Sequence, residues 1–520
     1  MATIIEILNN NAGIFCNKPI LHYKNIIVPY SEILDFSDKF AQALRNLNFQ
    51  PNDNIALLLP NIPEVFTAYF GCLKARCRVI PLSIQQRTYD LRNIIEQSNV
   101  KGIIFWDKFE RKLENVLKQV SIHPALIQVG NRAAIDSHYF SDVLEASESI
   151  SISEYPEDEH EAVILYSSGT TANPKGAILT HANIRESAQA IISRFEFTSN
   201  DKIVGILPVN HYLSQTLILN AALLCGAEIL LHPQFKSVEI CKYIQRNKAT
   251  VFVGIPSMYR EILDLPDLSP EVFSTLRFGI VSGSPVDSVL VNGYREKFGL
   301  PIIQSYGCIE TTSIIISTGR NEKYSNDEIG KPFPGVEVKI TDEDGSELLY
   351  GGIGEIAVKS PTNMKGYFNG SQSEDINDDS FSAGGGSTSG RPPETEQLQA
   401  EWVYPGDLCK WDENGNIELI GHKEELIDKG HFPVYPKEIE SCLESHPAVK
   451  EAAVIGVYDA EHIKEIKAFL ILHQDESVTI DEIAAFCSEK LPKYKRPKYI
   501  QFVDTLPKNL SGSVIKRFLK

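Results

Sequence analysis

The amino-acid sequence predicts an α/β fold, in which a large multi-subdomain N-terminal α/β domain has a smaller companion. The first observation is length, because 520 residues exceed what one ordinary hydrophobic core accommodates. The second is a regular alternation of helix-like and strand-like segments through the first third of the chain. Such alternation is typical of βαβ units, which build a mostly parallel sheet.

The alternating segments follow from the spacing of their apolar residues. Residues 30–47 and 64–75 carry apolar side chains at helical spacing, so we expect a helix in each. Residues 54–59 and 78–82 are short apolar runs that favour buried strands, and residues 162–165 form another. These segments predict two successive helix–strand pairs near the start of the chain.

Composition and charge exclude several classes of protein. With a formal net charge of −18, the chain lacks the basic surface of a nucleic-acid-binding protein. Nine scattered cysteines without a CxxC pair favour reduced thiols in a cytosolic protein over a disulfide framework or zinc site. The first residues show no secretion signal. The most apolar region, 217–231, is interrupted by Asn220, Gly226 and Glu228, which predicts a buried helix and strand and no membrane span.

A stretch rich in hydroxyl groups and glycine, YSSGTTANPKG at 166–176, follows the apolar run at 162–165. Small residues let backbone N–H groups turn towards a polyphosphate, hydroxyls can donate to its oxygens, and a lysine adds positive charge. The stretch is not a Walker A motif, because its glycine spacing and its ending differ. An ordinary surface loop is the alternative interpretation. The predicted phosphate-binding residues are Ser167, Ser168, Gly169, Thr170, Thr171 and Lys175.

Continued as AILTHANI to residue 184, this stretch closely resembles the phosphate-binding signature of the adenylate-forming superfamily. That superfamily includes acyl-CoA synthetases, coumarate-CoA ligase-like enzymes, luciferases and the adenylation domains of peptide synthetases. The resemblance recurs in order along nearly the whole chain. It implies that Mg²⁺·ATP activates a fatty or aryl acid to an acyl-adenylate. The acyl group then passes to the thiol of CoA or of a carrier-protein phosphopantetheine.

Three further motifs resemble the nucleotide site of the superfamily. The turn in FGIVSGSPVD (278–287) implies contacts to adenine from four residues. These are Ser282, Gly283, Ser284 and Pro285. SYGCIE (305–310) resembles a Tyr-Gly-x-Thr-Glu motif, which implies that Tyr306 stacks on adenine and that Glu310, with Thr171, ligates Mg²⁺. WVYPGD (402–407) places Asp407 where an aspartate holds the ribose hydroxyls.

The resemblance also implies a substrate pocket. LPVNHYLSQT (207–216) matches the motif whose histidine or aromatic side chain lines the carboxylate pocket. A lone histidine is more often structural, and that alternative stays open for His211. The predicted catalytic residues are His211, Glu310 and Lys175. The predicted substrate contacts are His211, Tyr212, Ser257, Gly307 and Cys308.

Residues 421–440 match the hinge to a small, mobile α+β domain, with Glu424 at the pivot. The resemblance therefore implies a large domain at 1–420 and a small domain at 421–520. We expect the remainder, 441–520, to run as a helix, strands at 452–457 and 468–472, a helix at 480–491 and a short tail. Residues 370–400 contain GGGSTSG and predict a flexible surface insertion, either a tolerated loop or a docking arm.

Several residues depart from the superfamily's pattern. Ile309 stands where a threonine would donate to the α-phosphate, and His422, at a nucleotide-contacting position, replaces an arginine. Ser513 replaces the lysine that reaches the acyl carboxylate and the α-phosphate. The other departures are Ala172, Pro405, Glu424 and His431. Glu424 replaces a lysine or aspartate at the pivot, and His431 lies in the thiol's path and weighs against free CoA.

The absence of this lysine leaves three hypotheses open. The first is a ligase with a slow first step, or with its lysine supplied by Lys508 or Lys516 after a register shift of the tail. The second is a binding protein on the same fold that holds a nucleotide or acyl ligand without turnover, or that partners another ligase. The third is an enzyme that takes a ready-made acyl-AMP or joins it to an amine.

Overall fold

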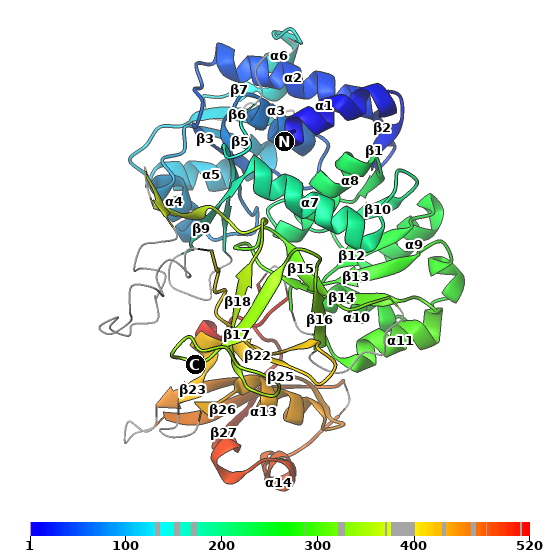
Figure 1. The fold of residues 1–520 in the computed structure, drawn as a ribbon, viewed down its shortest axis with the longest axis vertical. Coiled ribbons are helices and arrows are strands. Elements are labelled where there is room, and N and C mark those ends of the chain that lie inside the picture. The colour runs from blue at the N-terminus through cyan, green and yellow to red at the C-terminus, as the bar shows by residue number, and fades with distance from the viewer. Residues whose placement is uncertain are drawn as a thin grey trace.

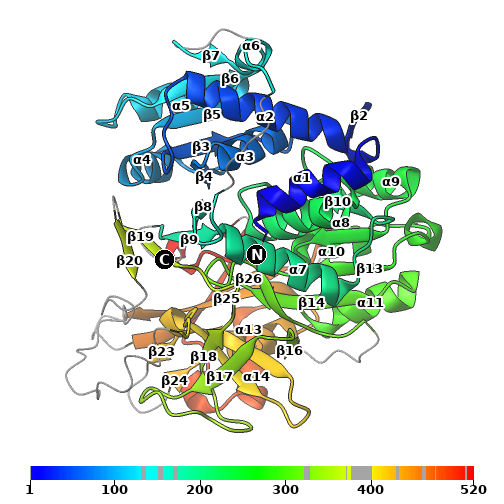
Figure 2. The same ribbon diagram turned by 45° about the horizontal axis from the view of Figure 1, so that its top comes forward.

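The structure is a computed structural model that describes most of the chain. The described residues are 2–130, 136–149, 156–167, 174–284, 286–320, 328–369, 372–375, 401–428, 433–458, 464–474, 476–509 and 512–519. Over these ranges the chain forms two large sheets and a small C-terminal lobe, which is drawn in orange and red at the bottom of Figure 1. Figure 2 shows the first sheet and its helices stacked above the rest of the large domain.

The first sheet has nine strands among the described residues and carries the predicted βαβ units. Its order is β20 (Gln372–Asp375), β19 (Gly366–Asn369), β9 (Gly176–Thr180), β8 (Glu161–Tyr166), β4 (Arg78–Pro81), β3 (Asn54–Leu58), β5 (Gly102–Trp106), β6 (Ala125–Val129) and β7 (His138–Tyr139). Strands β8, β4, β3, β5, β6 and β7 pair in parallel. The predicted parallel sheet and the strands expected near residues 54–59, 78–82 and 162–165 are confirmed.

The second sheet has thirteen strands in the described part of the chain. Its order is β17 (Glu337–Thr341), β18 (Gly354–Lys359), β21 (Asp407–Trp411), β22 (Ile417–His422), β16 (Glu328–Pro332), β15 (Ile314–Ser317), β14 (Ile302–Gly307), β13 (Phe278–Val281), β12 (Val251–Gly254), β10 (Lys202–Gly205), β11 (Glu228–Leu231), β1 (Pro19–Tyr23) and β2 (Ile26–Pro29). Strands β10 to β14 pair in parallel, whereas β15, β16, β22, β21 and β18 continue the sheet antiparallel. This change of direction follows β14, which ends at Gly307 in the SYGCIE motif.

Helices of the large domain cover these sheets (Figure 1). They are α1 (Ile4–Phe15), α2 (Tyr30–Asn46), α3 (Glu64–Lys74), α4 (Thr88–Gln97), α5 (Glu110–Leu117), α6 (Phe140–Glu145), α7 (His181–Phe195), α8 (Ala222–Cys225), α9 (Ser237–Asn247), α10 (Pro256–Leu263) and α11 (Ser288–Phe298), with short 3₁₀ turns η1 (Asp107–Phe109) and η3 (Pro270–Phe273). Helix α7 begins with a capping box, because Thr180 and Asn183 each accept the other's backbone N–H. The cap fixes where the chain turns after β9. The predicted helices at 30–47 and 64–75 are confirmed as α2 and α3.

The most apolar region forms a buried helix and strand, as predicted, but its helix is not α-helical at first. Ser214–Ala221 (η2) is a π-helix that continues into α8 before β11. Buried polar side chains, including Gln215 and Asn220, line it. A π-helix widens the helical turn and is frequent beside functional sites. Among the described residues no helix is long and apolar enough to cross a membrane.

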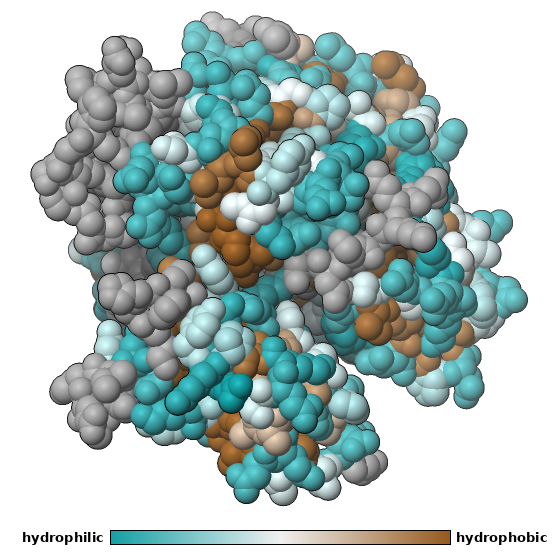
Figure 3. Space-filling view, turned by 60° about the horizontal axis from the view of Figure 1, so that its bottom comes forward, coloured by the Kyte–Doolittle hydropathy of each residue, from teal (hydrophilic) through white to brown (hydrophobic). Residues whose placement is uncertain are grey.

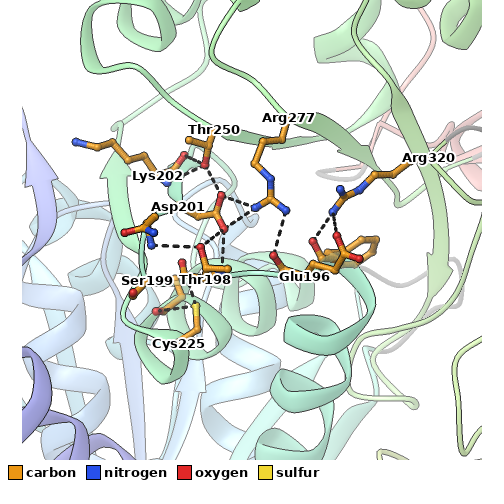
Figure 4. A network of polar contacts seen from close by, with 12 residues as sticks. Glu196, Thr198, Ser199, Asp201, Lys202, Cys225, Thr250, Arg277 and Arg320 are labelled. Carbon is orange, nitrogen blue, oxygen red and sulfur yellow. Dashed lines mark hydrogen bonds and ion pairs between the residues drawn. The ribbon is translucent and has the colours of Figure 1, made fainter.

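A polar network joins the ends where strands β10, β12 and β13 begin (Figure 4). Arg277 donates to both carboxylate oxygens of Asp201, at 2.7 and 2.6 Å, and Thr250 donates to Asp201 at 2.7 Å. Burial alone would raise the pKa of Asp201, but the hydrogen bonds from Arg277 and Thr250 outweigh it and lower that pKa. Arg277 and Arg320 also contact Glu196, just after α7. The network therefore ties α7 to the parallel strands at the edge where they begin.

The small domain packs two helices on an antiparallel hairpin with an added strand. Its elements are α13 (Pro436–Glu444), β25 (Val449–Tyr458), β26 (Lys464–Leu472), α14 (Ile480–Lys490), η6 (Lys493–Lys495), β27 (Tyr499–Phe502) and η7 (Lys516–Phe518). Strand β27 pairs in parallel with β26, so the expected short tail is wrong for residues 499–502. The segment YIQF is too short to show periodicity, and its partner lies about thirty residues earlier.

The insertion and the domain boundary lie at the edges of these sheets. Within the predicted insertion at 370–400, Gln372–Asp375 pairs with β19 as strand β20, and the flexibility of the insertion stays a prediction. Residues 370, 371 and 376–400 lie outside the described residues.

Strand β22 crosses residue 420, and the 3₁₀ turn η5 (Lys423–Glu425) and strands β23 (Ile427–Asp428) and β24 (Pro433–Val434) follow. The boundary at residue 420 stays a prediction.

The face in Figure 3 is predominantly hydrophilic, because teal residues predominate on it. The largest group of brown apolar residues forms an elongated patch near the centre of the view, and smaller groups lie elsewhere on this face. This surface agrees with the formal net charge of −18. Inside the large domain, the largest hydrophobic cluster includes residues from Ile4 to Met364, and two further clusters lie beside it.

Candidate active site

The predicted phosphate loop leaves the nine-stranded sheet between β8 and β9. Its two ends are joined by hydrogen bonds: the Ser167 N–H donates to the Lys175 carbonyl at 2.9 Å, and the Lys175 N–H donates to Ser167 Oγ at 3.2 Å. Strands β8 and β9 pair antiparallel up to Tyr166 and Gly176, immediately inside this neck. Ser168, Gly169, Thr170, Thr171 and Ala172 lie outside the described residues.

The predicted adenine turn follows β13 and contacts Tyr212. Gly283 has φ of +94°, which favours glycine at this turn. The Ser282 hydroxyl donates to the Ser305 carbonyl at 2.8 Å, and the Tyr212 hydroxyl is in hydrogen-bond contact with the Ser282 side chain. Ser284 follows directly, and Pro285 lies outside the described residues. The structure therefore brings the turn together with the predicted acid pocket.

His211 and Tyr212 form a buried pair of rings. Their centroids lie 4.8 Å apart in a stacked arrangement, and the Leu213 N–H donates to His211 Nδ1 at 3.2 Å. Burial lowers the pKa of His211 to about 4, so the ring is neutral at pH 7. A neutral ring can line a pocket or donate one hydrogen bond, but it supplies no positive charge.

The SYGCIE motif crosses the end of β14. A Cβ added at Gly307 would lie 2.0 Å from the Ser313 carbonyl oxygen, so only glycine fits there. Ile309 packs against the large core. Burial raises the pKa of Cys308, whose backbone N–H donates to Thr311 Oγ1 at 3.1 Å, so the thiol is protonated. Cys308 therefore offers the site a neutral, polarisable surface.

Tyr306 and Asp407 come from different parts of the second sheet and meet. The Tyr306 hydroxyl donates to Asp407 Oδ2 at 2.6 Å. Burial raises the pKa of Asp407, an effect partly offset by the nearby His422 and by the Tyr306 hydrogen bond. Asp407 and His422 are directly opposite one another on β21 and β22, and His422 Nδ1 accepts the Glu424 N–H at 3.3 Å. His422 therefore lies between Asp407, the predicted ribose-binding residue, and Glu424, the predicted hinge residue.

Glu310 has a partner that the sequence did not predict. The Tyr367 hydroxyl donates to Glu310 Oε1 at 2.8 Å, and the Tyr367 ring lies 5.2 Å from Lys175 Nζ. Tyr367 is on β19, in the segment GEIAVKSPTNMKGYFN (354–369), which matches the superfamily. That match was the available signal, but it assigns Tyr367 no role.

Comparison with protein families identifies the chain. The AMP-binding enzyme family matches residues 8–368, and the AMP-binding enzyme C-terminal domain family matches residues 438–513. The chain belongs to the AMP-binding, adenylate-forming enzyme family. The predicted superfamily is therefore confirmed.

Full-length relatives of the chain are CoA ligases. A long-chain-fatty-acid–CoA ligase of Bacillus subtilis is 28% identical over 99% of this chain and 94% of the relative. A 2-succinylbenzoate–CoA ligase of the same organism is 29% identical over 96% and 94%, respectively. The crystal structure of ATP-bound MatB from Rhodopseudomonas palustris has a TM-score of 0.87 and 25% identity, covering 99% of this chain and 98% of MatB. The predicted α/β fold with a large and a small domain is confirmed.

In this AMP-binding enzyme, the small domain closes on the predicted adenine turn through Ser513. The Ser513 hydroxyl donates to the Gly283 carbonyl at 3.3 Å, and the Asn509 side chain accepts the Ser513 N–H at 2.9 Å. A Cβ added at Gly512 would lie 3.3 Å from Ser257 Oγ. The exposed Ser257, predicted as a substrate contact, thus faces the small domain. A serine hydroxyl stands where the superfamily supplies a charged lysine.

The two lysines near Ser513 are engaged within the small domain and hinge. Lys516 Nζ lies 2.6 Å from Glu425 and 2.9 Å from Glu440, and its side chain is 15% exposed. Lys508 Nζ lies 2.7 Å from Glu451. In this arrangement neither lysine takes the place of Ser513. Pro405 is described within the large domain, whereas His431, predicted in the thiol's path, lies outside the described residues.

The residues present fit Mg²⁺·ATP. Glu310 offers hard carboxylate oxygens, and magnesium is commonly held by one or two carboxylates together with substrate phosphates. The described residues contain no cluster of three or more His, Cys, Asp or Glu that would form an all-protein metal cage. Lys175 is exposed at the neck of the loop and supplies positive charge. A bound magnesium ion would neutralise phosphate charge.

Proposed function

We propose that the protein is an acid–thiol ligase that activates a carboxylic acid with Mg²⁺·ATP and transfers the acyl group to CoA. One observation carries this proposal: residues from three separate stretches are held in two linked pairs, Lys175 with Glu310 through Tyr367, and Tyr306 with Asp407. The CoA-ligase relatives support the same reaction.

The reaction has two steps with separate leaving groups. In the first, a carboxylate oxygen of the acid attacks the α-phosphorus of ATP, and the bond to pyrophosphate breaks. In the second, the thiol sulfur attacks the acyl carbon, and AMP leaves with the bonding electrons. Lys175 offsets phosphate charge, Asp407 accepts hydrogen bonds from the ribose hydroxyls, and Glu310 holds magnesium. His211 and Tyr212 line the pocket of the acid, a fatty or aryl acid.

The first step is slow in this proposal, because Ser513 brings no charge to the reacting groups. Removing a preorganised donor of this kind costs about 10²- to 10³-fold in rate. The Ser513 contact with Gly283 also favours a second candidate function, in which the closed protein holds a nucleotide or acyl-adenylate without forming it.

The proposal also includes the thiol that accepts the acyl group and the location of the protein in the cell. Free CoA is the proposed acceptor, with a carrier-protein phosphopantetheine as the alternative, and Glu424 is the proposed pivot of the small domain between the two steps. All nine cysteines are free thiols, which supports a cytosolic location.

The test is ATP–pyrophosphate exchange over a panel of aryl, short fatty and long fatty acids, followed by thioester formation with CoA. We expect slow exchange with at least one class of acid. Silence with every acid, while ATP still raises the melting temperature, would favour the binding protein. Thioester formed only from synthetic acyl-AMP would assign the second step alone to this chain.

A further inference from the structure

Tyr367 joins two parts of the proposed ATP site that lie far apart in the sequence. Its hydroxyl donates to Glu310 Oε1 at 2.8 Å, and the ammonium of Lys175 lies over its ring, 5.2 Å from the centroid. Lys175 ends the predicted phosphate loop, and Glu310 ends the SYGCIE motif. One half-buried side chain therefore contacts both the phosphate-binding lysine and the magnesium-binding carboxylate.

Backbone hydrogen bonds to two different segments hold the chain that carries the Tyr367 side chain. Strand β19 pairs antiparallel with β9, which places Tyr367 opposite Ala177, two residues after Lys175. On the other side, the Met364 N–H donates to the Glu310 carbonyl at 2.8 Å. The chain between Met364 and Tyr367 thus bridges β9 and the SYGCIE motif. A shift of β19 would move the lysine and the glutamate relative to one another.

The chemistry of Tyr367 suits a donor to a carboxylate. A tyrosine hydroxyl can donate one hydrogen bond, and here it donates to Glu310 Oε1 at 2.8 Å. That hydrogen bond orients the carboxylate. The ring face, being electron-rich, attracts the Lys175 ammonium.

We propose that Tyr367 is a positioning residue for Mg²⁺·ATP, which orients Glu310 towards magnesium through its hydroxyl and holds Lys175 near the phosphates through its ring. This inference rests on the proposed function of the site. Residues that orient a metal-binding side chain in this way affect metal affinity about 10- to 100-fold when they are changed. The ring contact acts on the phosphates and does not require the metal.

Two substitutions separate these contacts. Tyr367→Phe keeps the ring beneath Lys175 and removes the hydroxyl, whereas Tyr367→Leu removes both. Calorimetric titration of the full chain with ATP, with and without Mg²⁺, measures each effect without turnover. We expect Tyr367→Phe to raise the Mg²⁺ concentration needed for half-maximal enhancement of ATP binding about 10- to 100-fold. Metal-free ATP binding stays as in the native chain. Tyr367→Leu additionally weakens metal-free binding.

Controls keep the outcomes distinct. Tyr350→Phe, at a tyrosine that is 69% exposed, serves as the matched control, and melting temperatures verify folding. An unchanged Mg²⁺ dependence in folded Tyr367→Phe would overturn the inference. So would a weakening of metal-free and metal-dependent binding by the same factor. If no acid supports pyrophosphate exchange while the expected Mg²⁺ shift is found, the proposed ligase activity fails and the inference stands. Absence of any ATP binding by the native chain would overturn both.

Discussion

On the large-domain side of the site, Tyr306 donates to Asp407 at 2.6 Å and Tyr367 donates to Glu310 at 2.8 Å. On the small-domain side, the position of the superfamily's lysine holds Ser513, whose hydroxyl contacts the Gly283 carbonyl. The first side retains the groups that would hold a nucleotide, and the second lacks the charge that would act on the reacting atoms. The proposed roles therefore assign nucleotide binding to the large domain and the missing first-step charge to the small domain. Substitutions in the large domain therefore test nucleotide binding, and substitutions in the small domain test the first step.

The largest expected effect comes from removing Asp407. Asp407→Ala deletes the proposed acceptor for two ribose hydroxyls, and each hydrogen bond to a charged group contributes about 1.5 to 3 kcal/mol. We therefore expect ATP binding to weaken about 10²- to 10⁴-fold by calorimetry. Asp344→Ala, in an exposed turn, is the control. Equal ATP affinity in Asp407→Ala and the native chain would show that Asp407 does not hold the nucleotide.

Acidification tests whether His211 is neutral. Its folded pKa is about 4 and its unfolded value about 6.5, so the unfolded chain binds more protons between these values. This stabilising contribution is complete above pH 6.5 and is lost as the pH falls towards 4, by about 1.4 kcal/mol per pH unit.

His211→Phe should lack that part of the pH dependence. Urea unfolding monitored by tryptophan fluorescence between pH 4 and 7 measures it, because all three tryptophans, Trp106, Trp402 and Trp411, are in the large domain. His473→Phe, at an exposed small-domain histidine, is the control. The same slope in His211→Phe and the native chain would show that the pKa of His211 does not change on folding.

Substitution of Lys516 tests whether this lysine stabilises the small domain or takes part in the reaction. Because it lies between Glu425 and Glu440, Lys516→Met should destabilise the small domain by about 2 to 3 kcal/mol. Hydrogen exchange of β25 and β26 measures this loss. Lys508→Met removes a more exposed pair and should cost at most about 1 kcal/mol. Loss of pyrophosphate exchange in Lys516→Met with unchanged protection would instead make Lys516 the replacement lysine.

The smallest expected effect is at the contact between the C-terminal tail and the large domain. The Arg87 guanidinium lies 4.2 Å from the centroid of the Phe518 ring, and such a contact contributes about 0.5 to 1 kcal/mol at an exposed site. Phe518→Ala should therefore speed proteolytic cleavage at the hinge about 2- to 5-fold. Phe518→Trp keeps a ring and serves as the control. Equal cleavage rates would show that this contact does not hold the small domain closed.

Local features of the fold were predictable from sequence, because their signals are short-range. The spacing of apolar residues predicted α2 and α3, and apolar runs predicted β3, β4 and β8. The π-helical form of η2 was not predictable, since π- and α-helices bury the same apolar residues. Strand β27 was missed because a four-residue strand depends on its partner rather than on its own pattern.

In the site, motifs predicted individual residues, but the contacts between distant residues were not predictable from sequence. Motifs gave Lys175, Glu310 and Asp407 by resemblance, and the structure places each beside a partner. The sequence could not show that Lys516 is held by two glutamates, or that Tyr367 contacts Glu310, 57 residues away. Both depend on how segments distant in the sequence pack together, which no local pattern encodes.

The most direct test of this account compares the native chain with Ser513→Lys in ATP–pyrophosphate exchange, using the best acid of the panel. Restoring the charge on the small-domain side should raise the exchange rate about 10²- to 10³-fold, with ATP affinity changed much less. Equal or slower exchange in a folded Ser513→Lys variant that still binds ATP would contradict the account. It would then follow that the missing lysine does not limit the first step.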